Sequence, residues 1–588
     1  MVNLVTFMAV VVVPAMAQAA PAATLSSIQV KAIPSTLLLA GQELQLAATG
    51  TYSDGTTADL TSQVAWSVSN TAVVKVSPSG LVNTLESKGG PGSSGPRDGG
   101  MPPGDGQSRG AGARPDGGPG SDNGAGPGGP ERPSRSGGGS GSDGMRPQGG
   151  PGGPVGGPGR GGMPAATKVS VTASVSSVTS PALSLTVKTT EGPAVYSQSG
   201  GTVAKSNQTI TTSDKATSGV KVTDGGTLTL SDSQVTTSGN TTGMEDSSFY
   251  GLNAGVLAMA SSKITMTGGS IATRGTGANG AFAVGAGSVV ELSKVKIDCV
   301  ASGAHGVDAT ITGTIICTDV DITTAGNGAA AAISTDRGSG TVTFTRGSAT
   351  TSGTRSPGIY STGSITVSDA KITATGSEAI VIEGRNSVTL NNTTLSCLRQ
   401  CGAMLYQSFS GDAGIGTSTL TMTGGSLTAA EGPMFYITNT AAAIDLKGNA
   451  KLSAASSVLI NAAAGRWGST GSNGGRLTFK ADGETLAGDI TCDDISTVIA
   501  TLQNKTTLKG AINAQGAAKA MALTLDATSV WEVTGTSYVT SLTDQDATLA
   551  NVHDNGHTIY YDPKADANQW LGGKTCPLSG GGKLVPCS

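Results

Sequence analysis

The segment Lys263-Ile-Thr-Met-Thr-Gly-Gly-Ser-Ile-Ala-Thr273 decides the fold, because apolar residues alternate with small polar ones on both sides of a Gly-Gly step. A period of two places the apolar side chains on one face of a strand. The pattern recurs at starts roughly 23 to 37 residues apart, a spacing typical of repeat folds. Equivalent segments occupy residues 227–237, 289–299, 365–374 and 419–429.

A third short strand lies between these segments, as in Gly255-Val-Leu-Ala-Met259 and Gly280-Ala-Phe-Ala-Val284. Three period-two strands per repeat, without helices, predict the coil of a parallel β-helix, whose core forms only when coils stack. Transmembrane hairpins are the competing β interpretation, but the aromatic girdles that they need are absent. We therefore expect a β-helix of about 12 to 14 coils over residues 190–560, with a cap over residues 561–588.

This repeat region resembles right-handed β-helix proteins of the pectate-lyase-like superfamily, and most closely autotransporter-type passengers and surface adhesins. The resemblance rests on the style of the repeats and on no catalytic signature. It therefore implies a right-handed parallel β-helix and leaves the activity open.

Residues 25–87 contain short strands separated by turns, which is typical of a β-sandwich. Here Gly50-Thr-Tyr-Ser-Asp-Gly55, Val64-Ala-Trp66-Ser and Ser79-Gly80-Leu81-Val82, with Pro34 and Gly41, resemble the bacterial immunoglobulin-like domain group 2. The match departs from the family after Val82, and closing strands follow only at residues 165–188. We expect an all-β chain in which a long insertion interrupts an immunoglobulin-like sandwich, with Trp66 in its core.

The insertion, residues 88–164, consists mostly of Gly, Pro, Ser, Asp and Arg. Such a composition buries too little apolar surface to offset the entropy of ordering, so we expect disorder. Residues 1–19 have the apolar run and small residues of a signal peptide, although no basic residue precedes the run. The sequence thus predicts an exported, secreted or cell-surface protein.

The composition excludes several classes of protein. With 13% charged residues, 3% aromatic residues and a net charge of -4, the chain lacks the basic surface and the stacking platforms of nucleic-acid binding proteins. A mean hydropathy near zero excludes a multispanning membrane protein, and no later segment predicts a transmembrane span. We predict no cofactor and no metal site.

One outward column of charges follows from aligning the repeats on their apolar positions. It contains Lys294, Asp319, Arg346 and Asp369, and the next column contains Lys296, Asp321, Ser348 and Lys371. Alternating signs at strand spacing favour stacking of successive coils. The functional alternative is a groove for a charged polysaccharide, with an aspartate as base or metal ligand.

Seven cysteines are present, and an exported chain permits disulfides among them. The spacing favours two local pairs, Cys397 with Cys401 and Cys576 with Cys587, although spacing alone leaves the connectivity open. A zinc site at Cys397 and Cys401 is disfavoured, because no second Cys or His pair accompanies them.

Catalytic motifs are weak. The nearest approach to a polysaccharide hydrolase is Ala304-His305-Gly306-Val-Asp308, a single His beside a single Asp, for which a structural role is the simpler interpretation. We therefore expect no catalytic residues and a non-enzymatic adhesin or stalk that contacts glycans, other cells or matrix components. The alternative is a carbohydrate-active β-helix enzyme, a polysaccharide lyase or a glycoside hydrolase.

Overall fold

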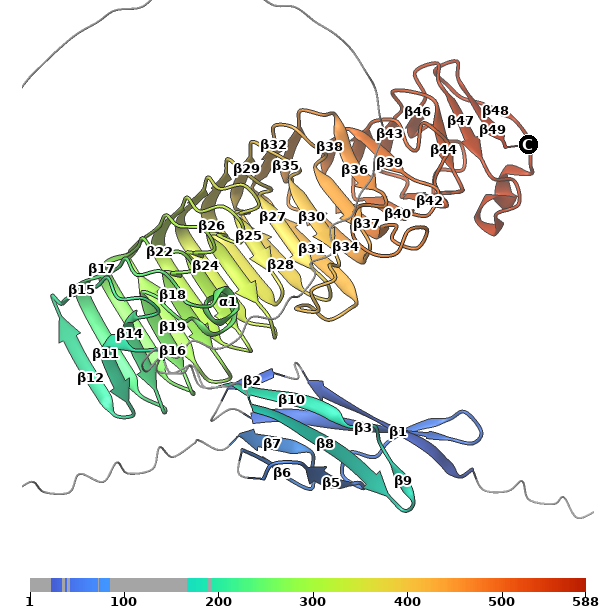
Figure 1. The fold of residues 1–588 in the computed structure, drawn as a ribbon. Coiled ribbons are helices and arrows are strands. Elements are labelled where there is room, and N and C mark those ends of the chain that lie inside the picture. Colours follow the sequence, from blue (N-terminus) through green and yellow to red (C-terminus); the bar gives the residue numbers. More distant parts are fainter. Residues whose placement is uncertain are drawn as a thin grey trace, which may run out of the picture. The chain divides into compact units, whose positions relative to one another are not determined.

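The structure is a computed structural model that describes residues 23–33, 37–39, 43–71, 73–84, 167–188 and 192–587. Strands account for 54% of the described residues and helices for 3%, so the described part of the chain is nearly all-β, as predicted (Figure 1). The predicted signal peptide and the predicted insertion over residues 88–164 lie outside these ranges. Neither helix within them has the length and apolar character needed to cross a membrane.

Two sheets form the small N-terminal region. Their orders are β1-β3-β7-β6, with β4 beside β3, and β2-β10-β8-β5, with β9 beside β8. Both sheets contribute to one apolar core, and Trp66 packs against it while its indole N–H donates to the Thr61 carbonyl at 3.2 Å. Because β8 pairs with β5, the segments before and after residues 88–164 belong to one sheet. The strands are β1 (Leu25–Ile33), β2 (Leu37–Leu39), β3 (Glu43–Tyr52), β4 (Thr57–Asp59), β5 (Ala65–Val68), β6 (Val74–Val76), β7 (Leu81–Thr84), β8 (Thr167–Val175), β9 (Val178–Thr179) and β10 (Leu183–Lys188).

A β-solenoid of about 16 turns follows, built from stacked parallel strands. Its 12-stranded sheet contains one short strand from each of twelve successive coils, in chain order. These strands are β11 (Ala194–Ser199), β14 (Ser218–Thr223), β16 (Val256–Met259), β18 (Ala281–Val284), β21 (Val307–Thr310), β23 (Ile333–Asp336), β25 (Ile359–Ser361), β27 (Ile380–Glu383), β30 (Ala403–Tyr406), β33 (Phe435–Thr438), β36 (Val458–Ala462) and β39 (Asp489–Cys492).

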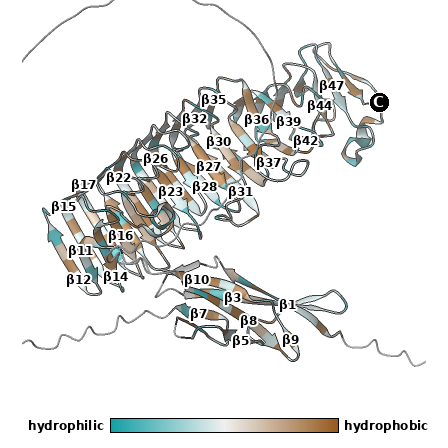
Figure 2. Ribbon diagram, viewed as in Figure 1, coloured by the Kyte–Doolittle hydropathy of each residue, from teal (hydrophilic) through white to brown (hydrophobic). Residues whose placement is uncertain are grey.

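The 19-stranded sheet contains the repeats that the sequence shows most clearly. Its strands are β12 (Thr202–Ser206), β13 (Thr209–Thr212), β15 (Thr227–Thr237), β17 (Lys263–Thr273), β19 (Val289–Ser293), β20 (Lys296–Cys299), β22 (Thr314–Thr324), β24 (Thr341–Thr351), β26 (Ser364–Ala374), β28 (Ser387–Asn391), β29 (Thr394–Cys397), β31 (Thr417–Thr423), β32 (Ser426–Ala429), β34 (Ala441–Lys447), β35 (Lys451–Ala454), β37 (Arg476–Asp482), β40 (Thr497–Gln503), β42 (Ala520–Leu525) and β45 (Ser541–Asp544). Figure 2 shows hydrophobic and hydrophilic residues alternating along these strands.

Each long strand of this sheet turns at its middle, where one or two residues have a positive φ. In β17 these residues are Gly268 and Gly269, with φ of 69° and 81°, which explains the Gly-Gly step. In the neighbouring coil the residue is Lys294, so that Leu292 and Val295 both point inward although they are three positions apart. The period of two therefore applies separately on each side of the turn, and each repeat forms two walls of the coil.

Close stacking of coils also requires glycine at one corner. A Cβ on Gly353 would collide with the carbonyl oxygen of Gly326 in the preceding coil, and one on Gly326 would collide with the carbonyl oxygen of Ala301. Many coils are short: Ser364 pairs with Thr341, Thr507 with Thr485 and Val530 with Thr507, at intervals of 23, 22 and 23 residues. The solenoid has about 16 turns rather than the 12 to 14 expected.

The prediction of a region without helices is wrong at one place, α1 (Met244–Tyr250). Its first turn is acidic, with Glu245 and Asp246, which suits the positive end of the helix dipole, and it ends at Gly251 in the left-handed conformation. Phe249 and Tyr250 of α1 pack with Leu257, Phe282 and Val284 over the outer face of the 12-stranded sheet. The helix thus covers this sheet at one end.

The last part of the chain forms two further small sheets and a short 3₁₀ helix. The elements are β38 (Thr485–Ala487), β41 (Thr507–Lys509), β43 (Val530–Glu532), β46 (Val552–His553), β44 (Ser537–Val539), β47 (Thr558–Tyr561), η1 (Asp566–Leu571), β48 (Cys576–Pro577) and β49 (Lys583–Pro586). Leu571, Leu578 and Leu584 pack against the solenoid core, so residues 561–588, as far as they are described, cover its C-terminal end.

Candidate functional site

The predicted charge column lies at the left-handed corner of the 19-stranded sheet. Lys294, Asp319, Arg346 and Asp369 have φ of 55°, 55°, 50° and 53°, and their side chains face solvent. The guanidinium of Arg346 donates from Nε to Asp319 Oδ1 at 2.8 Å, and this bond lowers the pKa of Asp319. In the same column the side-chain amide of Asn392 donates to Asp369 at 2.8 Å.

These contacts join neighbouring coils, and Val295, Ile297, Val320 and Ile322 point into the core beneath them. In the adjacent column, Ser348 donates to Asp321 at 2.6 Å. Pairs this exposed contribute little to stability, because solvent and salt screen them. The charge column therefore serves coil stacking, and none of the cavities described below lies beside it.

All seven cysteines are unbonded in the structure. Cys397 and Cys401 are buried, and the Cys397 thiol donates to the Cys401 carbonyl at 3.2 Å rather than bonding to the Cys401 sulfur. Cys576 lies opposite Leu584 in the pairing of β48 with β49, whereas Cys587 lies three residues beyond Leu584. Neither of the two expected disulfides is therefore present.

The outer face of the 12-stranded sheet carries two columns of side chains in which polar and aromatic residues are frequent. Pairing of β18, β21, β23, β25, β27, β30 and β33 aligns the second residue of each strand in one column and the fourth residue in another. The first column reads Phe282, Asp308, Ser334, Tyr360, Val381, Met404 and Tyr436, and the second contains Val284, Thr310, Asp336, Glu383, Tyr406 and Thr438.

Three contiguous cavities lie over these columns, with volumes of about 350, 760 and 480 Å³. All three share Glu378 and Met404. The first and second also share Arg355 and Trp467, and the second and third share Tyr436. They form one groove, which we call the sheet groove, running along the stack of coils from α1 to β36.

Two loops and α1 border the sheet groove. The loop at residues 407–416 contributes Asp412, and the loop at residues 463–475 contributes Arg466 and Trp467. The Trp467 ring packs against Tyr406 with ring centres 5.5 Å apart, and the Arg466 guanidinium lies 4.4 Å from the centre of the Trp467 ring. These contacts hold the aromatic rings over the sheet.

Glu383 organises the middle of the groove. The hydroxyls of Tyr360 and Tyr406 donate to Glu383 Oε2 at 2.7 and 2.8 Å, and Ser408 and Ser410 donate to Oε1. Only 1% of Glu383 is exposed. With its oxygens saturated by four hydroxyls, this carboxylate fixes two rings and the loop at residues 407–416 in place.

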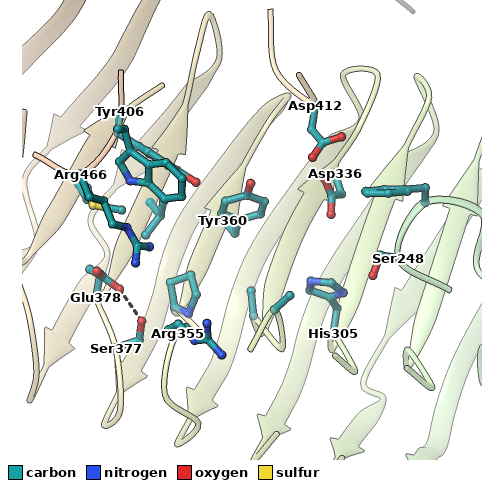
Figure 3. Close-up of a pocket in the computed structure, with 17 residues that line it drawn as sticks. Ser248, His305, Asp336, Arg355, Tyr360, Ser377, Glu378, Tyr406, Asp412 and Arg466 are labelled. Atoms are coloured by element: carbon teal, nitrogen blue, oxygen red, sulfur yellow. Dashed lines mark hydrogen bonds between the residues drawn. The ribbon is translucent and has the colours of Figure 1, made fainter. Parts of the chain in front are cut away.

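Asp336 occupies the groove floor beside these rings. Its Oδ1 accepts the backbone N–H of Arg337 at 2.8 Å, whereas no described residue donates to Oδ2. Burial, together with the charges of Asp412 and Glu383, raises the pKa of Asp336 to about 7. Figure 3 shows Asp336 and Asp412 on one side of Tyr360, with Arg355 and Glu378 on the other.

Asp308 lies on the strand next to Asp336 and is completely buried. Neither of its carboxyl oxygens has a hydrogen-bond partner of normal geometry, and burial and the nearby Asp336 raise its pKa well above the usual range. The Nδ1 atom of His305 lies 3.5 Å from Asp308 Oδ2. Burial lowers the pKa of His305 to about 4, so its imidazole is neutral at physiological pH. Of this sequence motif, His305 lines the groove whereas Asp308 does not, and the two side chains form no ion pair.

The groove was not predicted, because the long repeats dominate the sequence pattern and the third strand of the clearest coils, as in Gly255-Val-Leu-Ala-Met259, is apolar. The signal was present in Val307-Asp-Ala-Thr, Ile333-Ser-Thr-Asp and Ile380-Val-Ile-Glu, whose second and fourth residues are often polar. The rings Phe249 and Trp467 come from segments without a repeat, and no pattern indicated that they meet the sheet.

A metal centre is not evident, since no three His, Cys, Asp or Glu side chains converge on a common point within the described ranges. No family model matches the chain, and none of the curated proteins searched matches it either. The geometry of the sheet groove is therefore the basis for assigning a function.

Proposed function

We propose that this chain is an exported β-helix protein that binds an extended polysaccharide along its 12-stranded sheet. The observation that carries the proposal is the continuous sheet groove, in which Tyr360, Tyr406, Trp467 and Tyr436 follow one another beside carboxylates and guanidinium groups. Sugar rings present an apolar face to aromatic side chains and hydroxyls to charged ones, so such a lining suits them.

The shape of the groove supports a polymer rather than a single sugar. Successive coils repeat every ~4.8 Å, so a groove that crosses several coils accommodates several sugar residues. The rings are already held by Glu383 and by the loop contacts, which lowers the entropic cost of binding.

The proposed location and class rest on sequence. The apolar run within residues 1–19 supports export, the N-terminal strands resemble the bacterial immunoglobulin-like domain group 2, and the repeats resemble the pectate-lyase-like superfamily. An adhesin or stalk that holds a glycan at the cell surface fits this combination.

The test is binding of the full chain to a glycan array, followed by calorimetry with the best oligosaccharide. Trp467→Ala should reduce affinity about tenfold or more, because it removes a ring of the groove. Trp570→Ala is the matched control, since Trp570 lies on η1 and is 42% exposed outside the groove. Equal effects of the two substitutions would contradict the proposal.

A second candidate function is hydrolysis of the bound polysaccharide, which Asp336 specifically favours. A buried carboxyl with a pKa near neutrality is suited to donate a proton to a leaving oxygen. New reducing ends released by the wild type, and not by Asp336→Asn, would support this function; binding without cleavage supports the first.

A further inference from the structure

Four carboxyl groups lie close together on the α1 side of the sheet groove. Asp336 and Asp412 line the cavity, and Asp308 and Glu383 are buried on nearby strands. Arg337 is committed to Asp412, with its Nη2 2.7 Å from Oδ1, and its guanidinium lies over the Phe249 ring. His305 is neutral, and Arg355 lies on the other side of Tyr360 (Figure 3). Asp308, Asp336 and Glu383 consequently have no cationic side chain as a partner.

Two of these carboxyl groups are also poorly satisfied. Asp336 is 8% exposed and lines the cavity; its Oδ1 accepts a backbone N–H, whereas no described residue donates to Oδ2, which remains accessible. Asp308 is fully buried, does not line the cavity, and neither of its carboxyl oxygens has a hydrogen-bond partner of normal geometry. A group bound in the cavity that supplies a donor would give Asp336 Oδ2 the hydrogen bond that no described side chain provides.

The lining of the cavity suits an organic group better than a metal ion. No three carboxylate, imidazole or thiol groups in the described part of the chain converge as ligands would. The cavity of about 350 Å³ is instead lined by the rings Phe249, Tyr360, Tyr406 and Trp467. Rings beside an unsatisfied carboxyl group suit an organic cation that has a ring-sized body.

Building on the glycan-binding function proposed above, we propose that the preferred glycan contains hexosamine residues with free amino groups, and that Asp336 Oδ2 receives the ammonium group of one of them. The sugar ring lies against Tyr360 and Tyr406, and its ammonium group supplies the donor that the protein lacks. An N-acetylated residue has no charge and carries a bulkier substituent at this position, so it binds less well.

The experiment compares two matched pairs of oligosaccharides by calorimetry with the full chain at 150 mM salt. The pairs are chitosan with chitin oligosaccharides, and de-N-acetylated with acetylated β-1,6-linked N-acetylglucosamine oligosaccharides. We expect at least one free-amine member to bind about tenfold more tightly than its acetylated partner, the scale of a charge-assisted hydrogen bond. Asp336→Asn should remove that preference.

Asp319→Asn is the matched control, because it removes the same charge from an exposed site away from the groove and should preserve the preference. Equal binding within both pairs would overturn the amine inference while leaving the glycan function standing. A free-amine preference that survives in Asp336→Asn, or disappears in Asp319→Asn, would also overturn it. Absence of binding to every glycan on the array would refute both proposals.

Discussion

Replacing Asp336 with Asn should change how the stability of the protein depends on pH. In the folded protein the pKa of Asp336 is raised from 3.8 to about 7, because the side chain is buried and lies near Asp412 and Glu383. The unfolded chain therefore releases the proton at a lower pH than the folded chain does. Below pH 3.8 the carboxyl is protonated in both states, and its contribution to the free energy of unfolding is fully present. That contribution is lost as the pH rises through 7, because the unfolded chain is then free to ionise while the folded chain must bury the charge.

The size of the effect follows from the two pKa values. The gap between 3.8 and about 7 corresponds to on the order of 4 kcal/mol, at about 1.4 kcal/mol per pKa unit. An Asn side chain has nearly the same shape and does not titrate, so the variant should lack this part of the pH dependence. At pH 8 Asp336→Asn should therefore be more stable, relative to the wild type, than at pH 4.

The assay is urea unfolding of the wild type and Asp336→Asn at several pH values from 4 to 8. Asp319→Asn is the control whose difference from the wild type should change little over this range, since Arg346 lowers the pKa of Asp319 from 3.8 and the contribution of Asp319 is lost only as the pH falls below that value. If the difference in unfolding free energy between wild type and Asp336→Asn were constant from pH 4 to pH 8, the assignment of Asp336 as a buried, uncompensated carboxyl would be refuted.

Three further predictions concern the corner charges, the coil stacking and the groove. Asp319→Asn should lower the melting temperature by no more than about 2 °C and leave glycan binding unchanged, because the ion pair with Arg346 is exposed; a larger loss would show that the charge column does more than stack coils. Gly353→Ala should cost about 1–3 kcal/mol in urea unfolding, because its Cβ would meet the Gly326 carbonyl, whereas Gly414→Ala has open space and should cost much less. Tyr406→Phe should weaken glycan binding without unfolding the protein, since it frees one oxygen contact of Glu383 and loosens the ring; unchanged calorimetric affinity would argue against a preorganised groove.

The repeated part of the fold could be predicted because every coil shows the same alternation of apolar and polar residues. Alternation at Ile264, Met266 and Ile271 places apolar residues in the core, and stacking multiplies that signal along the chain. The sequence did not reveal that the residue at Lys294 is left-handed, because Lys is not a residue that favours this conformation.

The candidate site could not be predicted in the same way, because its parts come from segments that the repeat does not relate. Asp336 and Glu383 occur at the ends of short strands, where a single polar residue is easily taken for a surface position. Phe249 lies on the one α-helix of the described residues, and Trp467 lies in a loop, so their approach to the sheet depends on tertiary packing. The repeats predict the sheet itself, but the positions of α1 and of the loop that contains Trp467 over that sheet are seen only in the structure.

The most direct test of a glycan site on the 12-stranded sheet is a crystal structure of the protein with the oligosaccharide that binds most tightly on the array. We expect sugar density along the sheet groove, between Asp336 and Tyr436, with at least one sugar ring against Tyr406 or Trp467. Density along the corner that contains Lys294 and Asp369, with an empty sheet groove, would contradict it.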